Sequence, residues 1–142
     1  GLVSSACGLS LLDFSKEEDL NLVNEGRLTE QFIGQHLLYE GPPYRTPELY
    51  YWAREGRNAS AEVDYVTSLG PQVIPIEVKS GKTGSLRSLH LFLKEKKRLL
   101  SVRFNSEPPT LYKEGNLLLL SLPLYLIGQW RRILQEVSVE KN

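Results

Sequence analysis

Hydrophobic residues recur with the period of an α-helix between Arg27 and Tyr39. On a helical wheel they fill one arc of about 180°, which is wide enough to pack against a large surface. Glu30 lies at the edge of this arc, and Gly34, one turn further on, has no side chain to cover it. The pattern therefore predicts a packed helix that carries a half-buried glutamate. The residues of the arc are Leu28, Phe32, Ile33, Leu37 and Tyr39.

Three strand-like segments follow this helix, at residues 49–53, 62–67 and 73–79. The connections between them are short and polar or contain Gly and Pro, which suits hairpins, so an antiparallel meander is predicted. Because side chains alternate along a strand, Glu77 and Lys79 are expected on one face of the third segment. Pro75 cannot donate a ladder hydrogen bond, and this predicts a bulge or an unpaired amide close to Glu77.

Further periodic segments lie on both sides of the meander. Residues 13–24 have the spacing of a short capped helix or helical hairpin that connects to the rest. Residues 85–97 are amphipathic with a basic C-terminal end, which predicts a crossover helix. Residues 99–104 and 116–122 are strand-like, and residues 123–136 are expected to form a closing helix. The order helix, three strands, helix, strand, with extra elements, predicts an α/β domain.

Length and composition fit a single globular domain. At 142 residues the chain can bury one continuous core, and 41% hydrophobic with 24% charged residues excludes long disorder. No apolar run approaches the roughly 20 residues that cross a bilayer. Cys7 is the only cysteine, so no disulfide framework is expected and a cytoplasmic setting is favoured. The chain begins with glycine and contains no methionine, which favours a fragment of a longer protein.

Positive charge is concentrated in one part of this neutral chain. Residues 79–103 hold 8 basic side chains against Glu95 alone, a net charge of +7, whereas residues 1–64 hold 5 basic and 11 acidic side chains. Basic clusters neutralise phosphates and supply most nonspecific nucleic-acid affinity. The segment is therefore a candidate nucleic-acid-binding region, and the alternative is a solvated helix face. The candidate residues are Lys82, Arg87, Lys94, Lys96 and Lys97, together with Lys79, Arg98 and Arg103.

Asp64 in the second strand-like segment and Glu77-x-Lys79 at the end of the third form a candidate catalytic group. On adjacent strands, two carboxylates and one amine would converge, and Mg²⁺ prefers carboxylate, carbonyl and water oxygens. Asp64, Glu77 and the Val78 carbonyl make a plausible ligand set, and Glu30 on the covering helix could bind a second metal. Lys79 would position or deprotonate the attacking water and stabilise charge on a phosphate. The alternative is a chance spacing of solvent-facing charges.

Four ordered motifs of the sequence resemble one family. They are NEGRLTEQFI at residues 24–33, LYYW at 49–52, SAEVDYV at 60–66 and IPIEVKSG at 74–81. The resemblance is to the C-terminal domain of unknown function that follows an AAA-type ATPase domain in many prokaryotic proteins. That domain is assigned to the PD-(D/E)XK, or restriction-endonuclease-like, superfamily. The proline of the superfamily's name is absent here, because Val63 precedes Asp64.

This resemblance implies a restriction-endonuclease-like fold, in which a central mixed β-sheet is flanked by helices. It implies that Glu30, Asp64, Glu77 and Lys79 form a metal-dependent nuclease site, with Glu30, Asp64 and Glu77 as ligands of Mg²⁺ or Mn²⁺. It further implies that residues 1–25 connect to an N-terminal ATPase domain and that residues 26–142 form the nuclease-like domain. The chain itself has no Gly-x-x-x-x-Gly-Lys-Ser/Thr phosphate loop, so no ATP binding by that motif is expected.

Three functions are therefore compatible with the sequence. The first is a metal-dependent nuclease that hydrolyses phosphodiester bonds of DNA or RNA. The second is a nuclease-derived binding or regulatory module that helps the ATPase recognise nucleic acid or a protein partner without cutting. The third is a dimerisation module, which is suggested by Tyr50, Tyr51, Trp52 and Trp130 because all four aromatic residues need not be buried.

Overall fold

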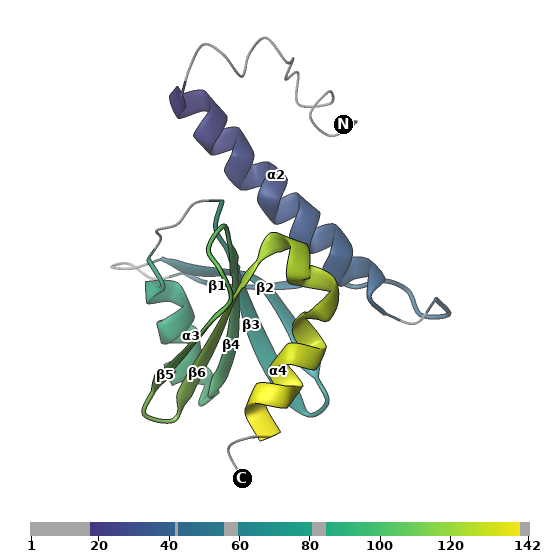
Figure 1. The fold of residues 1–142 in the computed structure, drawn as a ribbon, viewed down its shortest axis with the longest axis vertical. Helices are drawn as coiled ribbons and strands as arrows, with labels where there is room; N and C mark the ends of the chain where they lie inside the picture. The colour runs from purple at the N-terminus through teal and green to yellow at the C-terminus, as the bar shows by residue number, and fades with distance from the viewer. Residues whose placement is uncertain (1–17, 42, 56–59, 81–84, 140–142) are drawn as a thin grey trace.

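The structure is a six-stranded mixed β-sheet covered by helices on both faces, as Figure 1 shows. This computed structural model describes residues 18–41, 43–55, 60–80 and 85–139. The predicted α/β fold with a central mixed sheet flanked by helices is confirmed. The helical elements are α2 (Glu18–Tyr39), α3 (Arg87–Lys96), the 3-10 helix η2 (Leu124–Gln129) and α4 (Trp130–Val139). The strands are β1 (Tyr50–Arg54), β2 (Ala61–Leu69), β3 (Gln72–Val78), β4 (Leu100–Asn105), β5 (Thr110–Glu114) and β6 (Leu117–Pro123).

The sheet combines an antiparallel half with a parallel centre. Its strand order is β1-β2-β3-β4-β6-β5. The first three strands pair antiparallel, which confirms the predicted meander, and Gly70 provides the positive φ of 58° at the tight turn between β2 and β3. β3, β4 and β6 run parallel to one another. This is possible because α3 connects β3 to β4 and β5 connects β4 to β6. β5 pairs antiparallel with β6 at the far edge and was not predicted.

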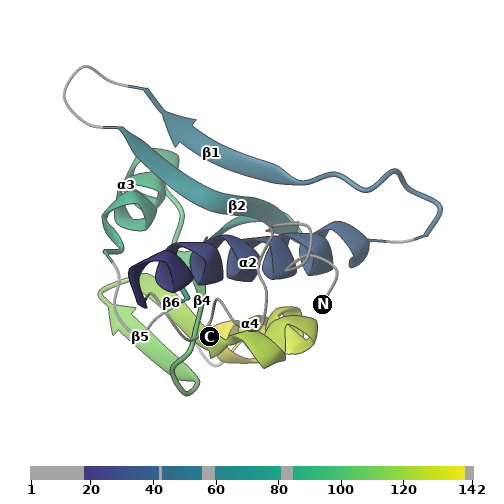
Figure 2. The same cartoon turned by 90° about the horizontal axis from the view of Figure 1, so that it is seen from above.

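The helices on the two faces of the sheet pack against two separate hydrophobic clusters. The larger cluster joins α2, η2 and α4 to one face of the sheet and includes Ile33, Ile76, Phe104 and Trp130. The smaller cluster joins α3 to the other face and contains Val63, Leu89 and Phe92. Figure 2 shows α3 apart from α2 and α4, and β1 at the outer edge of the sheet.

Helix α2 is longer and less covered than the sequence predicts. Its described part starts at Glu18, so residues 18–24 belong to this helix and not to a separate short helix or hairpin, and residues 13–17 of the predicted segment lie outside the described residues. Ile33 and Leu37 are buried as predicted, but Phe32 is 43% and Tyr39 is 73% exposed. The sheet and η2 therefore cover a narrower stripe of the helix than the apolar arc. The proposed domain boundary after residue 25 lies within this helix.

The C-terminal segment also differs in detail from the prediction. Residues 124–129 form a 3-10 helix, and the α-helix starts only at Trp130 and continues to Val139. Trp130 is fully buried, and its Nε1 donates a hydrogen bond of 2.8 Å to Oε1 of Glu40. This contact ties α4 to the end of α2. No helix in the described part of the chain is long and apolar enough to cross a membrane.

A β-bulge occurs in β2, beside Asp64. Tyr50 pairs with Val66 and Trp52 pairs with Val63, so two steps along β1 oppose three steps along β2. The β2–β3 register, in contrast, is regular from Leu69↔Gln72 to Tyr65↔Ile76. The bulge that Pro75 was expected to cause is thus absent from the β2–β3 ladder. It lies in the neighbouring strand, where it displaces Asp64 from simple alternation.

Candidate functional site

The candidate site lies where β2 and β3 separate. Their ladder ends at Tyr65↔Ile76, whereas β3 stays paired with β4 as far as Val78↔Phe104, and the Lys79 amide donates to the Phe104 carbonyl at 2.9 Å. The amide of Val78 instead donates to Oδ2 of Asp64 at 2.6 Å. A side-chain carboxylate therefore takes the place of a backbone acceptor, and it fixes Asp64 against the strand that carries Glu77 and Lys79.

Glu77 and Lys79 form an ion pair at this point. The Lys79 Nζ lies 2.5 Å from Glu77 Oε1, and the side chains of Lys79 and Glu77 are 29% and 6% exposed, respectively. The other carboxylate oxygen, Oε2 of Glu77, is buried and has no hydrogen-bond donor among the described residues. Buried polar atoms are normally paired, so an unpaired carboxylate oxygen is an unusual feature and marks a place where a cation would be stabilised.

Glu30 reaches the same region from helix α2. The hydroxyl group of Tyr65 donates to the backbone carbonyl of Glu30 at 2.9 Å, which holds the helix against the strand beside Asp64. Gly34 makes this approach possible, because a Cβ at that position would lie 2.6 Å from the Tyr65 hydroxyl oxygen. Gly34 was expected only to leave Glu30 uncovered, and its contact with Tyr65 was not predicted.

Burial raises the pKa of Glu30, Asp64 and Glu77 above the ordinary carboxyl values. The Val78 amide and the Lys79 ammonium oppose this effect at Asp64, and the hydrogen bond from Lys79 opposes it at Glu77. Burial alone lowers the pKa of Lys79, but the Glu77 hydrogen bond and the carboxylate charges outweigh it, so the pKa is raised. The four groups are thus close enough to influence one another's ionisation.

The donor set is chemically suited to a hard divalent cation, because it has two carboxylates and one of them, Glu77, keeps an unpaired buried oxygen. Its geometry is less complete. In the part of the chain that the structure describes, no group of three or more His, Cys, Asp or Glu side chains is arranged to hold a metal ion. Asp64 and Glu77 would hold the cation together with carbonyl and water oxygens. Glu30 is an electrostatic neighbour and is not placed as a third ligand.

Most of the predicted nucleic-acid-binding residues lie on the surface. Arg87, Lys94, Lys96 and Lys97 are exposed on or just after α3. Lys82 lies outside the described residues. Arg103 is only 8% exposed, at the register of Glu77 on the adjacent strand, so it does not belong to the exposed basic surface. The sequence count of +7 therefore overstates the charge available at the surface of this segment.

The fold and the polar cluster define an α/β domain that presents two acidic residues and a lysine where two strands separate. Comparison with known families is more specific. The chain belongs to the family described as Domain of unknown function (DUF4143), whose model matches residues 25–125. Searches of the curated proteins and of the solved structures found no match.

Proposed function

We propose that this domain is a Mg²⁺- or Mn²⁺-dependent nuclease of the PD-(D/E)XK type, which hydrolyses phosphodiester bonds in nucleic acid. One observation carries the proposal. Glu77 keeps a buried carboxylate oxygen without a hydrogen-bond donor among the described residues, beside an ammonium group and a second carboxylate that the Val78 amide holds. A group whose role was structural would be satisfied within the protein.

Each residue has a defined task in this proposal. Asp64 and Glu77 would hold the cation, which when bound supplies Lewis-acid polarisation of the phosphate and neutralises its charge. The Val78 amide keeps the Asp64 carboxylate in one orientation. Lys79, which the Glu77 carboxylate fixes, stabilises negative charge on the phosphate oxygens. Glu30 adds negative charge at the edge of the site and so favours cation binding.

In the overall reaction, a water oxygen forms the new bond to phosphorus and the bond to the leaving sugar oxygen breaks. The proton that water releases balances the proton that the leaving oxygen takes up. Because the Glu77 pair favours the charged form of Lys79, we assign this side chain to charge stabilisation and water positioning, not to proton abstraction.

The setting of the activity is also part of the proposal. The four motifs resemble a domain that follows an AAA-type ATPase, so an ATPase domain of the same protein and nucleic acid are the proposed partners. The support for the ATPase is this resemblance of the sequence. The support for nucleic acid is the exposed basic surface of Lys94, Lys96 and Lys97.

Cleavage assays with a metal titration test the nuclease activity. Wild-type protein incubated with labelled oligonucleotides and Mn²⁺ or Mg²⁺ should cut them, and EDTA should stop the reaction. Asp64→Asn and Glu77→Gln preserve side-chain shape and should lower the rate by about 100-fold or more. Glu114→Gln, at an exposed position on β5, is the matched control and should retain the rate. Undiminished cleavage by both site variants, or no cleavage by folded wild type at any metal concentration, overturns the proposal.

A second candidate function is a nucleic-acid-binding module that does not cut. The observation that favours it is the lack of a three-ligand metal group in the described residues, together with the occupation of Glu77 Oε1 by Lys79. This candidate predicts salt-dependent binding without turnover. The double variant Lys96→Glu with Lys97→Glu should weaken that binding, whereas Asp64→Asn should leave it unchanged.

A further inference from the structure

Two surface cavities adjoin along β1, away from the candidate catalytic residues. The larger, of about 690 Å³, lies between the segment that precedes β1 and the end of β2. The smaller, of about 300 Å³, lies between β1 and the end of α3. Both are lined by Tyr50, Val66 and Val73, so the two cavities share a wall at the start of β1. We refer to the two cavities together as the β1 groove.

Aromatic side chains line the β1 groove. Tyr50 is 57% and Tyr51 is 68% exposed, and Trp52 is partly buried. Phe92 of α3 supports the Trp52 ring edge-on, with ring centroids 5.4 Å apart. Exposed apolar residues that lie next to one another and are rimmed by polar residues mark interaction sites. Their presence in a groove indicates a ligand with flat, apolar faces.

Cationic side chains stand at both ends of the groove. Lys96 and Arg98 line its narrow end, and the exposed Arg45 lines its wide end. Arg98 is partly exposed and lines the smaller cavity, so its guanidinium group can contact an anionic partner there. The exposed Lys94 and Lys97 lie beside Lys96 at the end of α3 and extend the positive surface.

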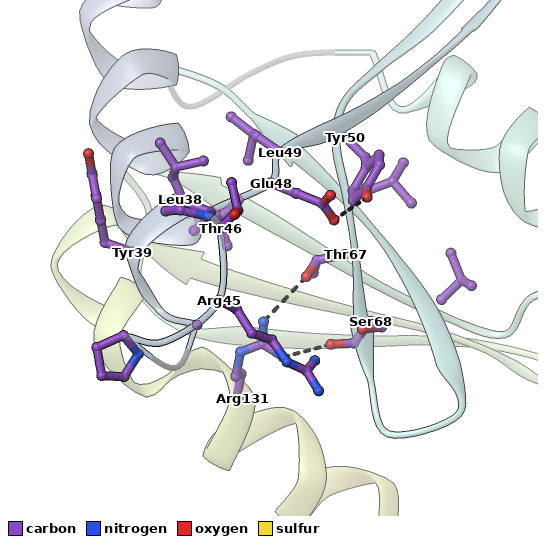
Figure 3. Close-up of a pocket in the computed structure, with 16 residues that line it drawn as sticks. Leu38, Tyr39, Arg45, Thr46, Glu48, Leu49, Tyr50, Thr67, Ser68 and Arg131 are labelled. Atoms are coloured by element: carbon purple, nitrogen blue, oxygen red, sulfur yellow. Dashed lines mark hydrogen bonds between the residues drawn. The ribbon is translucent and has the colours of Figure 1, made fainter.

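The other charged residues of the groove have partners within the protein. Figure 3 shows Arg131, which donates to the Ser68 carbonyl and the Thr67 hydroxyl, and Glu48, which accepts from the Tyr50 hydroxyl. Arg131 also pairs with Glu40 at 2.8 Å. Glu48 keeps its negative charge beside Arg45 in the larger cavity, whereas the charged residues of the smaller cavity, Lys96 and Arg98, are both positive.

We propose that the β1 groove binds single-stranded nucleic acid, with bases stacked on Tyr50 and Tyr51 and phosphates bound by Lys96, Arg98 and Arg45. The inference deepens the proposed nuclease function by naming its substrate as single-stranded, and it rests on that function only for the link to cleavage. Unpaired bases present the flat faces that aromatic side chains bind, and every base has such a face, so the site is independent of sequence. In a duplex these faces are stacked on one another inside, and only the base edges and the sugar-phosphate backbone are accessible.

Binding is measured with the whole chain and Ca²⁺ or EDTA, so that cleavage does not contribute. The probes are fluorescent oligo-dT and oligo-U of about 16 nucleotides. Fluorescence anisotropy should show saturable binding that weakens with salt, and the tighter of the two probes identifies the sugar. A duplex of the same length should bind more weakly than the tighter single strand. Equal or tighter binding of the duplex, or no binding of either single strand, overturns the inference.

Variants locate the binding site. Tyr50→Ala and Tyr51→Ala should each raise the dissociation constant about tenfold, which is the effect of losing one stacked base. Tyr125→Ala is the matched control, because Tyr125 is 78% exposed on η2, outside the groove, and its loss should not affect binding. Lys96→Ala should reduce the slope of log K against log salt by about 0.7, as expected for one phosphate contact. Unchanged binding by all three groove variants overturns the proposed site.

We refer to the candidate site, where β2 and β3 separate, as the fork. Two further comparisons distinguish binding in the groove from cleavage at the fork and from self-association. If Asp64→Asn stops cleavage but retains groove-dependent binding, both functions stand. If wild type binds through the groove and never cleaves, the nuclease function fails and the groove stands. Sedimentation velocity tests whether β1 instead pairs with a second copy. A dimer that Tyr51→Ala dissociates, combined with unchanged oligonucleotide binding, overturns the inference in favour of self-association.

Discussion

The fork of β2 and β3 and the β1 groove lie on neighbouring strands, but their side chains differ in burial and in pairing. At the fork, the side chains of Glu77 and Lys79 are 6% and 29% exposed and are paired with each other. In the groove, Tyr50 and Tyr51 are more than half exposed, and their rings are not required to fill a core. The fork is thus part of the folded structure, whereas the rings of the groove lie on its surface.

From this difference we expect that substitutions at the fork change the free energy of unfolding, whereas substitutions in the groove change ligand binding alone. Buried charges have lost their hydration, so removing one member of a pair leaves the other uncompensated. Exposed rings and cations keep their contact with water, so their removal changes the folded and unfolded states almost equally. Stability measurements on matched substitutions in the two regions can therefore test the contrast directly.

The largest effect is expected for Lys79→Met. This substitution keeps the aliphatic stem and leaves the Glu77 carboxylate buried without its ammonium partner. The free energy of unfolding at pH 7 should fall by about 3 kcal/mol, at the lower end for a broken buried pair because Lys79 is partly exposed. Urea denaturation followed by circular dichroism measures the change. Lys96→Met, at an exposed position beside the groove, is the control and should change stability by less than about 0.5 kcal/mol.

The double variant Glu77→Gln with Lys79→Met refines this test. It should recover most of the lost stability, because the uncompensated charge is gone. If Lys79→Met and Lys96→Met have the same small effect, the fork pair is not a structural element and the contrast between the regions fails.

A second, smaller loss is expected for Gly34→Ala. The new Cβ would lie 2.6 Å from the Tyr65 hydroxyl oxygen and 2.9 Å from Cζ of its ring, so α2 or the ring must move. A cost of about 2 kcal/mol is expected from this overpacking. Gly26→Ala in the same helix meets no atom closer than 3.9 Å and should stabilise the protein by about 1 kcal/mol. Thermal unfolding of both variants measures the difference, and equal shifts in one direction would contradict the packing of Tyr65 against Gly34.

The smallest effect is the dependence of wild-type stability on pH. Burial raises the pKa values of Asp64 and Glu77 above the values of 3.8 and 4.5 that apply to unperturbed groups. The folded state then binds more protons than the unfolded state, so the free energy of unfolding should decrease as pH rises above these values towards neutrality. Each unit of elevation corresponds to about 1.4 kcal/mol. Denaturation curves between pH 4.5 and 7 measure this slope.

Two substitutions assign that slope to the fork. Glu77→Gln removes one of the titrating groups and should flatten the curve. Glu114→Gln, at an exposed position on β5, should leave it as in the wild type. A wild-type curve that rises towards neutral pH would show that the carboxylates are stabilised by their partners more than they are destabilised by burial.

Much of the fold could be predicted because its signals are local. The alternation in the meander and the amphipathic pattern of α3 predicted their elements to within a few residues. β5 escaped prediction because it is a short edge strand whose residues, such as Lys113 and Glu114, are mostly exposed. The exposure of Phe32 and Tyr39 could not be predicted either, because periodicity gives the width of an apolar arc but not the width of the surface that covers it.

The strand pairing beside the candidate site was predictable, but the contacts within the site were not. The antiparallel pairing of β2 with β3, which predicts that Asp64 lies near Glu77 and Lys79, is confirmed. The hydrogen bond from the Val78 amide to Asp64 depends on the bulge in β2, and no residue in β2 signals a bulge in the sequence. The β1 groove depends on Tyr50, Val66 and Val73 from three strands, and only the tertiary structure shows that they line the same cavities.

Helix α2 has a mechanical consequence that follows from its length. Its 22 residues span about 33 Å, and its N-terminal end stands away from the sheet in Figure 1. The other end is anchored by Ile33, Leu37 and the bond from Tyr65 to the Glu30 carbonyl. We therefore expect that a force on the N-terminal end of α2 moves Glu30, which lies close to the anchored part, less than it moves the N-terminal end itself.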